Sequence, residues 1–249
     1  MLTPDLQKII DISKRRDICI TTTTNGSLLR IEKYRNLALQ FRSVGISFDS
    51  TTKEGFERTR IGGDFDAVIE GIKSLTKQNK MTGKKAKIGL NFVVTHLNYT
   101  QIPDMFDIAM GLGVDSINLP PVENWYIPSE KEFADSHAFA LKARARAGDM
   151  RRLVLELRKR LKPHGIEVSM GSYEKGRKYK CNWPFRNVFI TADGFVTPCC
   201  IRMNSAAFNF GSIYSTDDFG KIWNGQEYRN FRKANLEGLP NPICDNCPC

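Results

Sequence analysis

The cysteines near the end of the chain are the residues with the clearest capacity for chemistry. Six of the seven lie between Cys181 and Cys249. Cys244 and Cys247 have two residues between them, so a single tight loop can present both thiolates to one metal ion or cluster. With Cys181 and Cys199 as the other two ligands, the four thiolates would suit a tetrahedral zinc ion or a cubane iron–sulfur cluster.

A predicted β-hairpin would bring Cys199 to such a site. Residues 185–190 are expected to form a strand, 191–194 a turn and 195–198 the returning strand. On a strand, Cys199 and Cys200 would point to opposite faces, so only one of them can easily be a ligand. The spacing from Gly194 favours Cys199 as the ligand. The sequence leaves open whether Cys200 and Cys249 also act as ligands.

A disulfide framework is the alternative explanation of these cysteines. It is disfavoured because residues 1–6 lack the basic start and apolar core of a secretory signal, and because the number of cysteines is odd. Cysteine clusters in intracellular enzymes more often bind metal. Cys19 lies apart from the others in an apolar stretch and is predicted to be a small buried hydrophobic residue.

Composition fits one medium-sized domain followed by a small one. The chain has 249 residues, 41% of them hydrophobic, and no apolar run approaches the roughly 18 residues that span a bilayer. The formal net charge of +10 would suit nucleic acid, acidic lipid or an anionic substrate. Much of the excess positive charge lies between Lys142 and Lys162, without interleaved aromatic residues. We therefore expect a solvated helix face there and no nucleic-acid partner.

Helix and strand patterns alternate four times in the first half of the chain. The expected helices are 4–14, 29–41, 65–78 (capped by Asp64) and 102–112; the expected strands are 17–23, 44–48, 87–95 and 116–119, with a polar loop at 50–63. The strands are mostly apolar, as expected where both faces of a sheet are covered. The alternation predicts an α/β fold with about four parallel strands, which are too few to close a barrel.

Polar residues gather where these strands end, which is the edge at which parallel α/β folds bind ligands. They include Thr24, Asn25, Ser47, Asp49, Asn91, His96 and Asn118. Later in the chain we expect a helix over 130–161 that breaks at Gly148, and a short strand at 210–213. A last helix, capped by Asp217 or Asp218, is expected to run to Leu236 and to shield the metal.

These motifs, in this order, resemble radical S-adenosylmethionine (SAM) enzymes with a C-terminal auxiliary-cluster domain of the SPASM or twitch type. Thr24-Asn25-Gly26 resembles the family's TNG strand end, and Ile46–Asp49 with Arg60 and Gly62-Gly63 resembles its SxD…R.G segment. The matching residues of the cluster domain are Asp193-Gly194, Pro198–Cys200, Gly211–Ile213, Ile222-Trp223, Arg229 or Arg232, and Cys244–Cys247.

The resemblance implies a partial radical-SAM (β/α) barrel over residues 1–128, a basic helical linker over 129–180 and a cluster domain of one hairpin plus helices over 181–249. The single cysteine set resembles the shorter twitch version, with one auxiliary [4Fe-4S] cluster on Cys181, Cys199, Cys244 and Cys247. Ser47 and Arg60 would hold the methionyl carboxylate of SAM, and Asn91 and Asn118 would contact its ribose or adenine. Strand-end capping by Ser47 and Asn118, and an ion pair of Arg60 with Asp64 or Glu57, are the structural alternatives.

In the full family, a reduced cluster cleaves SAM, and the 5′-deoxyadenosyl radical takes hydrogen from a small-molecule or peptide substrate. The resemblance also implies a reductant such as flavodoxin or ferredoxin and a cytoplasmic location without membrane association. The family's CxxxCxxC loop and GGEP segment are absent, and residues 1–6 resemble the family's stretch after GGEP. We therefore expect the chain to start after the second barrel strand, with an incomplete SAM site and no radical formation of its own. The alternative function is a non-enzymatic module that binds structural zinc through the cysteines and nucleic acid through the basic helix.

Overall fold

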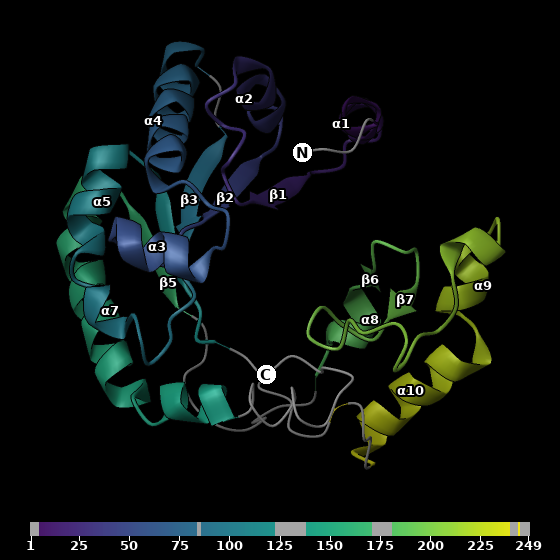
Figure 1. The fold of residues 1–249 in the computed structure, drawn as a ribbon. Coiled ribbons are helices and arrows are strands. Elements are labelled where there is room, and N and C mark those ends of the chain that lie inside the picture. Colours follow the sequence, from purple (N-terminus) through teal and green to yellow (C-terminus); the bar gives the residue numbers. More distant parts are fainter. Residues whose placement is uncertain (1–4, 84–85, 123–137, 171–180, 240–243, 245–249) are drawn as a thin grey trace. The chain divides into compact units, whose positions relative to one another are not determined.

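The computed structural model describes residues 5–83, 86–122, 138–170, 181–239 and 244, and the chain divides into two compact units (Figure 1). The sheet unit comprises residues 1–122 and 142–173, and the cysteine unit comprises residues 123–141 and 174–249. Among the described residues, no helix has the length and apolar character needed to cross a membrane.

The sheet unit is built on one parallel sheet of five strands in the order β1-β2-β3-β4-β5. The strands are β1 (Thr21–Thr24), β2 (Ser43–Ser47), β3 (Lys87–Asn91), β4 (Ser116–Leu119) and β5 (Glu167–Met170). The helices are α1 (Leu6–Arg15), α2 (Glu32–Ala38), α3 (Lys53–Thr59), α4 (Phe65–Met81), η1 (Tyr99–Gln101), α5 (Met105–Leu112), α7 (Ala147–Leu161) and η2 (Lys162–His164). The predicted parallel α/β sheet is thus confirmed.

The fifth strand, β5, was not predicted. It pairs in parallel with β4, and α7 crosses over between them, so residues within the predicted linker complete this sheet. The basic helix therefore has a buried face, formed by Met150, Val154, Leu157 and Leu161 at spacings of three and four residues. The predicted break in the helix lies at residues 145–146 and not at Gly148, and residues 130–137 fall outside the described part.

The two faces of the sheet differ, which corrects the expectation that both are apolar. The covered face carries the buried residues Val44, Ile46, Ile88, Leu90, Ile117, Leu119 and Val168, which share one core with side chains of α4, α5 and α7. These helices lie along one side of the sheet (Figure 1). The alternate positions of the paired strands are polar residues or glycine: Ser43, Gly45, Ser47, Lys87, Gly89, Asn91, Ser116, Asn118, Glu167 and Ser169. We call this second surface the polar face.

The segment predicted to be a polar loop at 50–63 contains helix α3. Thr52 caps this helix by accepting a hydrogen bond from the Gly55 backbone N–H. The apolar anchor is Phe56, which is buried to 1% exposure and packs with Phe48 and Phe65 at ring-centroid distances of 5.6 Å. One buried aromatic residue on a short polar helix gives too weak a periodic signal for the sequence to reveal it.

The described part of the cysteine unit has little regular structure. Its elements are α8 (Trp183–Arg186), β6 (Phe189–Ile190), β7 (Val196–Thr197), η3 (Ile213–Ser215), α9 (Phe219–Trp223) and α10 (Gln226–Glu237). The predicted hairpin exists but is shorter, because 185–186 belong to α8. The predicted strand at 210–213 contributes a single bridge between Ser212 and Phe195. The predicted last helix is two helices, separated at Asn224-Gly225, and Asp218 caps the first of them.

Candidate functional sites

The first candidate site is a row of polar side chains across the polar face. Ser47, Asn91, Asn118 and Ser169 are register partners on four successive strands. Ser169 Oγ donates to Asn118 Oδ1 at 2.9 Å, and Asn118 Nδ2 donates to Asn91 Oδ1 at 3.4 Å. Because register partners of parallel strands point the same way, three of the predicted SAM-binding residues share one surface.

Glycines make room for the polar side chains of this face. A Cβ on Gly45 would lie 2.5 Å from Asn91 Nδ2, and a Cβ on Gly89 would lie 2.4 Å from Ser116 Oγ. Both distances are too short for a real contact, so these side chains lie over the strand next to them. The polar face can therefore present amide and hydroxyl groups close to the backbone of the sheet.

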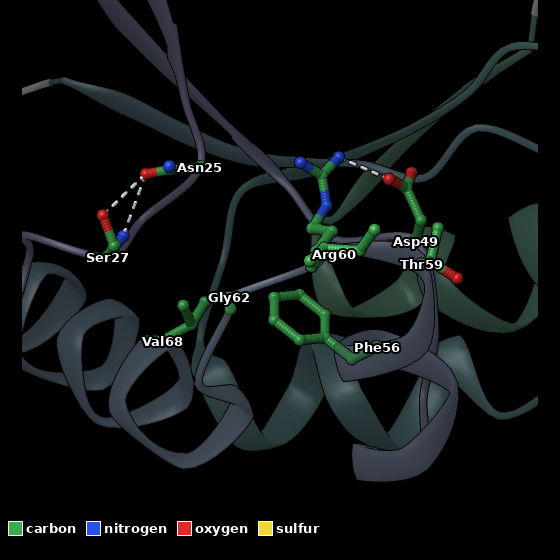
Figure 2. Close-up of a pocket in the computed structure, with 10 residues that line it drawn as sticks. Asn25, Ser27, Asp49, Phe56, Thr59, Arg60, Gly62 and Val68 are labelled. Atoms are coloured by element: carbon green, nitrogen blue, oxygen red, sulfur yellow. Dashed lines mark hydrogen bonds and ion pairs between the residues drawn. The ribbon is translucent and has the colours of Figure 1, made fainter.

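A pocket lies at the carboxyl edge of the same sheet, with a volume of about 380 Å³. It is lined by Asn25, Ser27, Asp49, Phe56, Thr59, Arg60, Ile61, Gly62, Gly63 and Val68 (Figure 2). Asn25 Oδ1 accepts hydrogen bonds from the backbone N–H and the hydroxyl of Ser27. Gly26 between them has φ +82°, and a Cβ there would meet Ile46 and Val68 at 3.1 Å, so this turn after β1 requires glycine.

Asp49 and Arg60 form the charged centre of the pocket. Arg60 Nη2 donates to Asp49 Oδ2 (Figure 2). The other carboxylate oxygen of Asp49 accepts the Val93 N–H at 2.8 Å. Asp49 is 8% exposed, while Arg60 Nε is buried without a partner in the described part of the chain. The partner of Arg60 is thus Asp49, rather than Asp64 or Glu57, the two partners considered from the sequence.

The pair gives the pocket a fixed acceptor beside a fixed donor. A guanidinium whose Nη2 is held by Asp49 keeps its orientation and still has donors for a second group. The two charges nearly cancel, so this arrangement suits a zwitterionic ligand better than a simple anion. Of the predicted SAM-binding residues, Arg60 lines the pocket, and Ser47, Asn91 and Asn118 belong to the polar row.

The second candidate site is the set of cysteines. Cys181, Cys199 and Cys200 are half-buried free thiols, Cys244 is half-buried, and Cys247 and Cys249 lie outside the described residues. Within the described part, no three His, Cys, Asp or Glu side chains form a group that could hold a metal ion. Because these described cysteines are free thiols, they give no support to the alternative of a disulfide framework. Cys19 is exposed, contrary to the prediction, and receives a hydrogen bond from Arg42 at 3.7 Å.

The strand argument for choosing between Cys199 and Cys200 does not apply, because β7 ends at Thr197. Burial raises the pKa of the Cys200 thiol, and the neighbouring Cys199 raises it further. A higher pKa leaves less thiolate at neutral pH. The choice of Cys199 over Cys200 as the ligand therefore stays a prediction.

The surroundings of the cysteines contain buried polar atoms that lack partners. Cys244 packs against an apolar cluster of Val196, Phe210, Ile222, Tyr228 and Phe231. Five buried atoms in this unit have no hydrogen-bond partner in the part of the chain that the structure describes: Trp183 Nε1, Thr197 Oγ1, Tyr228 Oη, Arg232 Nη2 and Asn235 Oδ1. Such atoms call for an explanation, and a bound group with acceptor sulfurs is one for the donors among them. The half-buried thiols and these donors fit a thiolate-ligated cluster.

Residues 181–248 match the family model of the SPASM domain, which is described as an iron–sulfur cluster-binding domain. Over 99% of its length the chain is 24% identical to the PqqA peptide cyclase of Gluconobacter oxydans, of which it spans 66%. It is also 25% identical, over 98% of its length, to the tungsten-containing aldehyde ferredoxin oxidoreductase cofactor-modifying protein of Pyrococcus furiosus, of which it spans 69%.

Among solved structures, the chain is similar to Streptococcus suis SuiB bound to the precursor peptide SuiA. The TM-score is 0.65 with 15% sequence identity, over 92% of this chain and 53% of that one. This likeness shows that the two proteins share a fold. The present chain therefore spans about two thirds of its first two relatives and about half of SuiB.

Proposed function

Since the chain belongs to the radical SAM proteins that carry a C-terminal SPASM domain, we propose that it binds SAM with its sheet unit and an auxiliary [4Fe-4S] cluster with its cysteine unit. The observation that carries the proposal is the pairing of Asp49 with Arg60 in a pocket at the carboxyl edge of the parallel sheet. Ligands bind at this edge in folds of this kind.

The methionyl end of SAM is a zwitterion, which an oriented Arg60 and the carboxylate of Asp49 would complement. Arg60 would donate to the methionyl carboxylate, and Asp49 would hold the guanidinium in place. Ser47, Asn91 and Asn118 would offer hydroxyl and amide groups to the ribose or adenine. Amides that already hydrogen-bond to each other are pre-oriented for such contacts, which reduces the entropy lost on binding.

In the cysteine unit, Cys181, Cys199, Cys244 and Cys247 would be the cluster ligands, as one thiolate set of the twitch type. When bound, a [4Fe-4S] cluster supplies one-electron redox chemistry, at a potential set by its surroundings. The apolar residues of the unit would exclude water from it, since Tyr228 and Val196 are fully buried. A reducing compartment such as the cytoplasm, with flavodoxin or ferredoxin as electron donor, suits this chemistry.

For the substrate, we propose a peptide. The support is that a relative matched over nearly the whole chain is named a peptide cyclase. A small cofactor-like molecule is the second candidate, because the Pyrococcus relative is named as a cofactor-modifying protein. In either case the 5′-deoxyadenosyl radical would take a hydrogen atom from the substrate, and transfer of the remaining electron to the auxiliary cluster would make the net reaction an oxidation.

Anaerobic reconstitution with iron and sulfide tests the cluster. We expect brown protein with about four irons per chain, the content of one cubane. A colourless protein that binds about one zinc ion per chain would favour the zinc module instead. About eight irons, with methionine released from SAM on reduction, would contradict the expectation that this chain holds a single cluster.

Equilibrium dialysis with labelled SAM tests the sheet unit. We expect the chain to bind SAM through the incomplete site on its sheet unit, and to bind it more weakly when Asp49 is changed to Asn, because the guanidinium then loses its charged partner. Lys53→Gln is the matched control, since Lys53 is exposed, pairs with Asp66 and does not line the pocket. Equal affinities for all three proteins would contradict the assignment of the pocket.

A further inference from the structure

We infer that Tyr228 and Arg232 act together as a donor pair beside the sulfurs of the auxiliary cluster, and that they raise its reduction potential. The inference rests on the proposed cluster and assigns the two residues a positioning and tuning role. Neither residue is a ligand. Both lie on α10, four residues apart, and therefore on the same face of the helix.

Arg232 is held in place by contacts that use most of its guanidinium. Its Nε donates to the Pro184 carbonyl at 2.8 Å, and its Nη1 donates to the Trp223 carbonyl at 2.7 Å. The guanidinium carbon lies 4.0 Å from the ring centroids of both Trp223 and Tyr228. Two hydrogen bonds and two ring faces fix the plane of the group, so the direction of its remaining donors is fixed as well.

These contacts reach the segments that carry the cysteines. Pro184 lies three residues after Cys181, at the start of α8. Tyr228 stacks on Phe210 at 3.9 Å, inside the apolar cluster that contains Val196 and against which Cys244 packs. Val196 begins β7, which ends two residues before Cys199. The donor pair thus contacts or adjoins the chain near three of the four proposed ligands.

What remains unused is one donor on each residue. Arg232 Nη2 and the Tyr228 hydroxyl are buried and have no hydrogen-bond partner among the described residues. Tyr228 as a whole is completely buried. A thiolate or cluster sulfur is an acceptor that accounts for two buried donors at once, and Cys244 packs against the apolar cluster that contains Tyr228.

Both donors would affect the cluster in the same direction. Hydrogen bonds to sulfur and a nearby positive charge stabilise the more negative, reduced form, so they raise the potential. The alternative is that Tyr228 and Arg232 only pack against their neighbours, a role that needs neither the hydroxyl nor the charge. The donor role and the packing role therefore predict different potentials when the hydroxyl or the charge is removed without loss of side-chain volume.

The test measures the midpoint potential of the reconstituted chain by EPR-monitored redox titration. Three variants are compared with the wild type: Tyr228→Phe, which removes only the hydroxyl, Arg232→Met, which removes the charge, and Arg232→Lys, which keeps it. We expect Tyr228→Phe and Arg232→Met to favour the oxidised form about tenfold, a shift of about 59 mV for a one-electron couple. Arg232→Lys should shift the potential less than Arg232→Met.

Arg229→Met is the matched control. Arg229 lies on the same helix and is exposed, and its side chain donates to Gln226, so the change removes one charge from the surface. Its potential should stay near that of the wild type. If Tyr228→Phe leaves the potential unchanged, or if Arg232→Met shifts it no more than Arg229→Met does, the proposal that Tyr228 and Arg232 donate to the cluster is wrong.

Stability and iron content separate the remaining outcomes. In the apo protein, Tyr228→Phe should not lower the unfolding temperature, because the hydroxyl has no partner there. If Arg232→Met fails to hold iron, Tyr228→Phe and Arg232→Lys decide the question. If the wild type itself binds no iron–sulfur cluster, the proposed function fails. If the wild type holds a cluster and its potential does not change when Tyr228 or Arg232 is replaced, only this inference is contradicted.

Discussion

The polar row of the sheet unit and the cysteines of the other unit are positioned in opposite ways. Ser47, Asn91 and Asn118 are aligned by the register of β2, β3 and β4, whose backbone hydrogen bonds fix each side chain to a face and a level. The described cysteines lie in loops, two or more residues from the nearest short strand or helix. What holds those loops is a small aromatic cluster and the contacts of Arg232.

The difference concerns where the stability of each site originates. The sheet unit has a large apolar core on the covered face, so its site can form before any ligand arrives. The cysteine unit has a core of five fully or nearly buried residues and several buried polar atoms without partners among the described residues. We therefore expect the first site to be preformed and the second to depend on its metal.

Removing a cysteine ligand should have the largest effect. Cys199→Ala should reduce the iron content to near zero and destabilise the cysteine unit, because metal binding there is coupled to folding. Cys200→Ala should keep about four irons and lose only the packing of a small side chain. Iron analysis and thermal unfolding of both variants check this prediction. A colourless Cys200→Ala protein beside a brown Cys199→Ala protein would reverse the ligand assignment.

Truncation of the aromatic anchor of α3 should have the next largest effect. The loss of stability should be confined to the sheet unit. Phe56→Ala removes a ring that is 1% exposed and packs between Phe48 and Phe65, so we expect a loss of about 3–5 kcal/mol in the free energy of unfolding.

Urea denaturation measures the loss, and Ile61→Ala is its control, because Ile61 lines the same pocket but is 97% exposed. The control should change the unfolding free energy by less than about 0.5 kcal/mol. Iron content should be the same in both variants. If Phe56→Ala also loses its iron, the two sites are not independent.

The charged centre of the pocket should matter for binding. Arg60→Ala should weaken SAM binding by about 1.5–3 kcal/mol, the range for a charge-assisted hydrogen bond. Arg58→Ala is the control, since Arg58 is exposed, lies on α3 two residues before Arg60 and is not a pocket residue. Equilibrium dialysis gives both dissociation constants. Unchanged binding by Arg60→Ala would mean that the ion pair with Asp49 is purely structural.

The smallest effect should come from the glycines of the polar face. Gly45→Ala places a methyl group where Asn91 Nδ2 now lies, and that flexible amide can move aside. We expect a stability change within about 1 kcal/mol, because alanine is also the better strand residue. SAM binding should weaken if Asn91 takes part in it. In Gly148→Ala the new methyl group meets nothing within 4 Å, and binding should stay as it is.

The sequence by itself determined the parallel α/β class, because alternating helices and apolar strands are a local pattern. It also identified most strand ends: β4 was predicted at its observed bounds, and Asp64 was correctly predicted to cap α4. The capping interaction involves residues only three apart, so sequence alone can reveal it. Motif order, which is again a property of the chain, led to the radical SAM family.

The tertiary structure decided how distant residues meet. Only the register shows that Ser47, Asn91 and Asn118 form one row, and that a face of the sheet is polar. Only the packed structure shows that Arg60 pairs with Asp49, although Glu57 and Asp64 are nearer in sequence. The same holds for the hydrogen bond from Arg232 to the Pro184 carbonyl. In each case the partners are separated along the chain and are brought together by burial of apolar side chains, which no local pattern records.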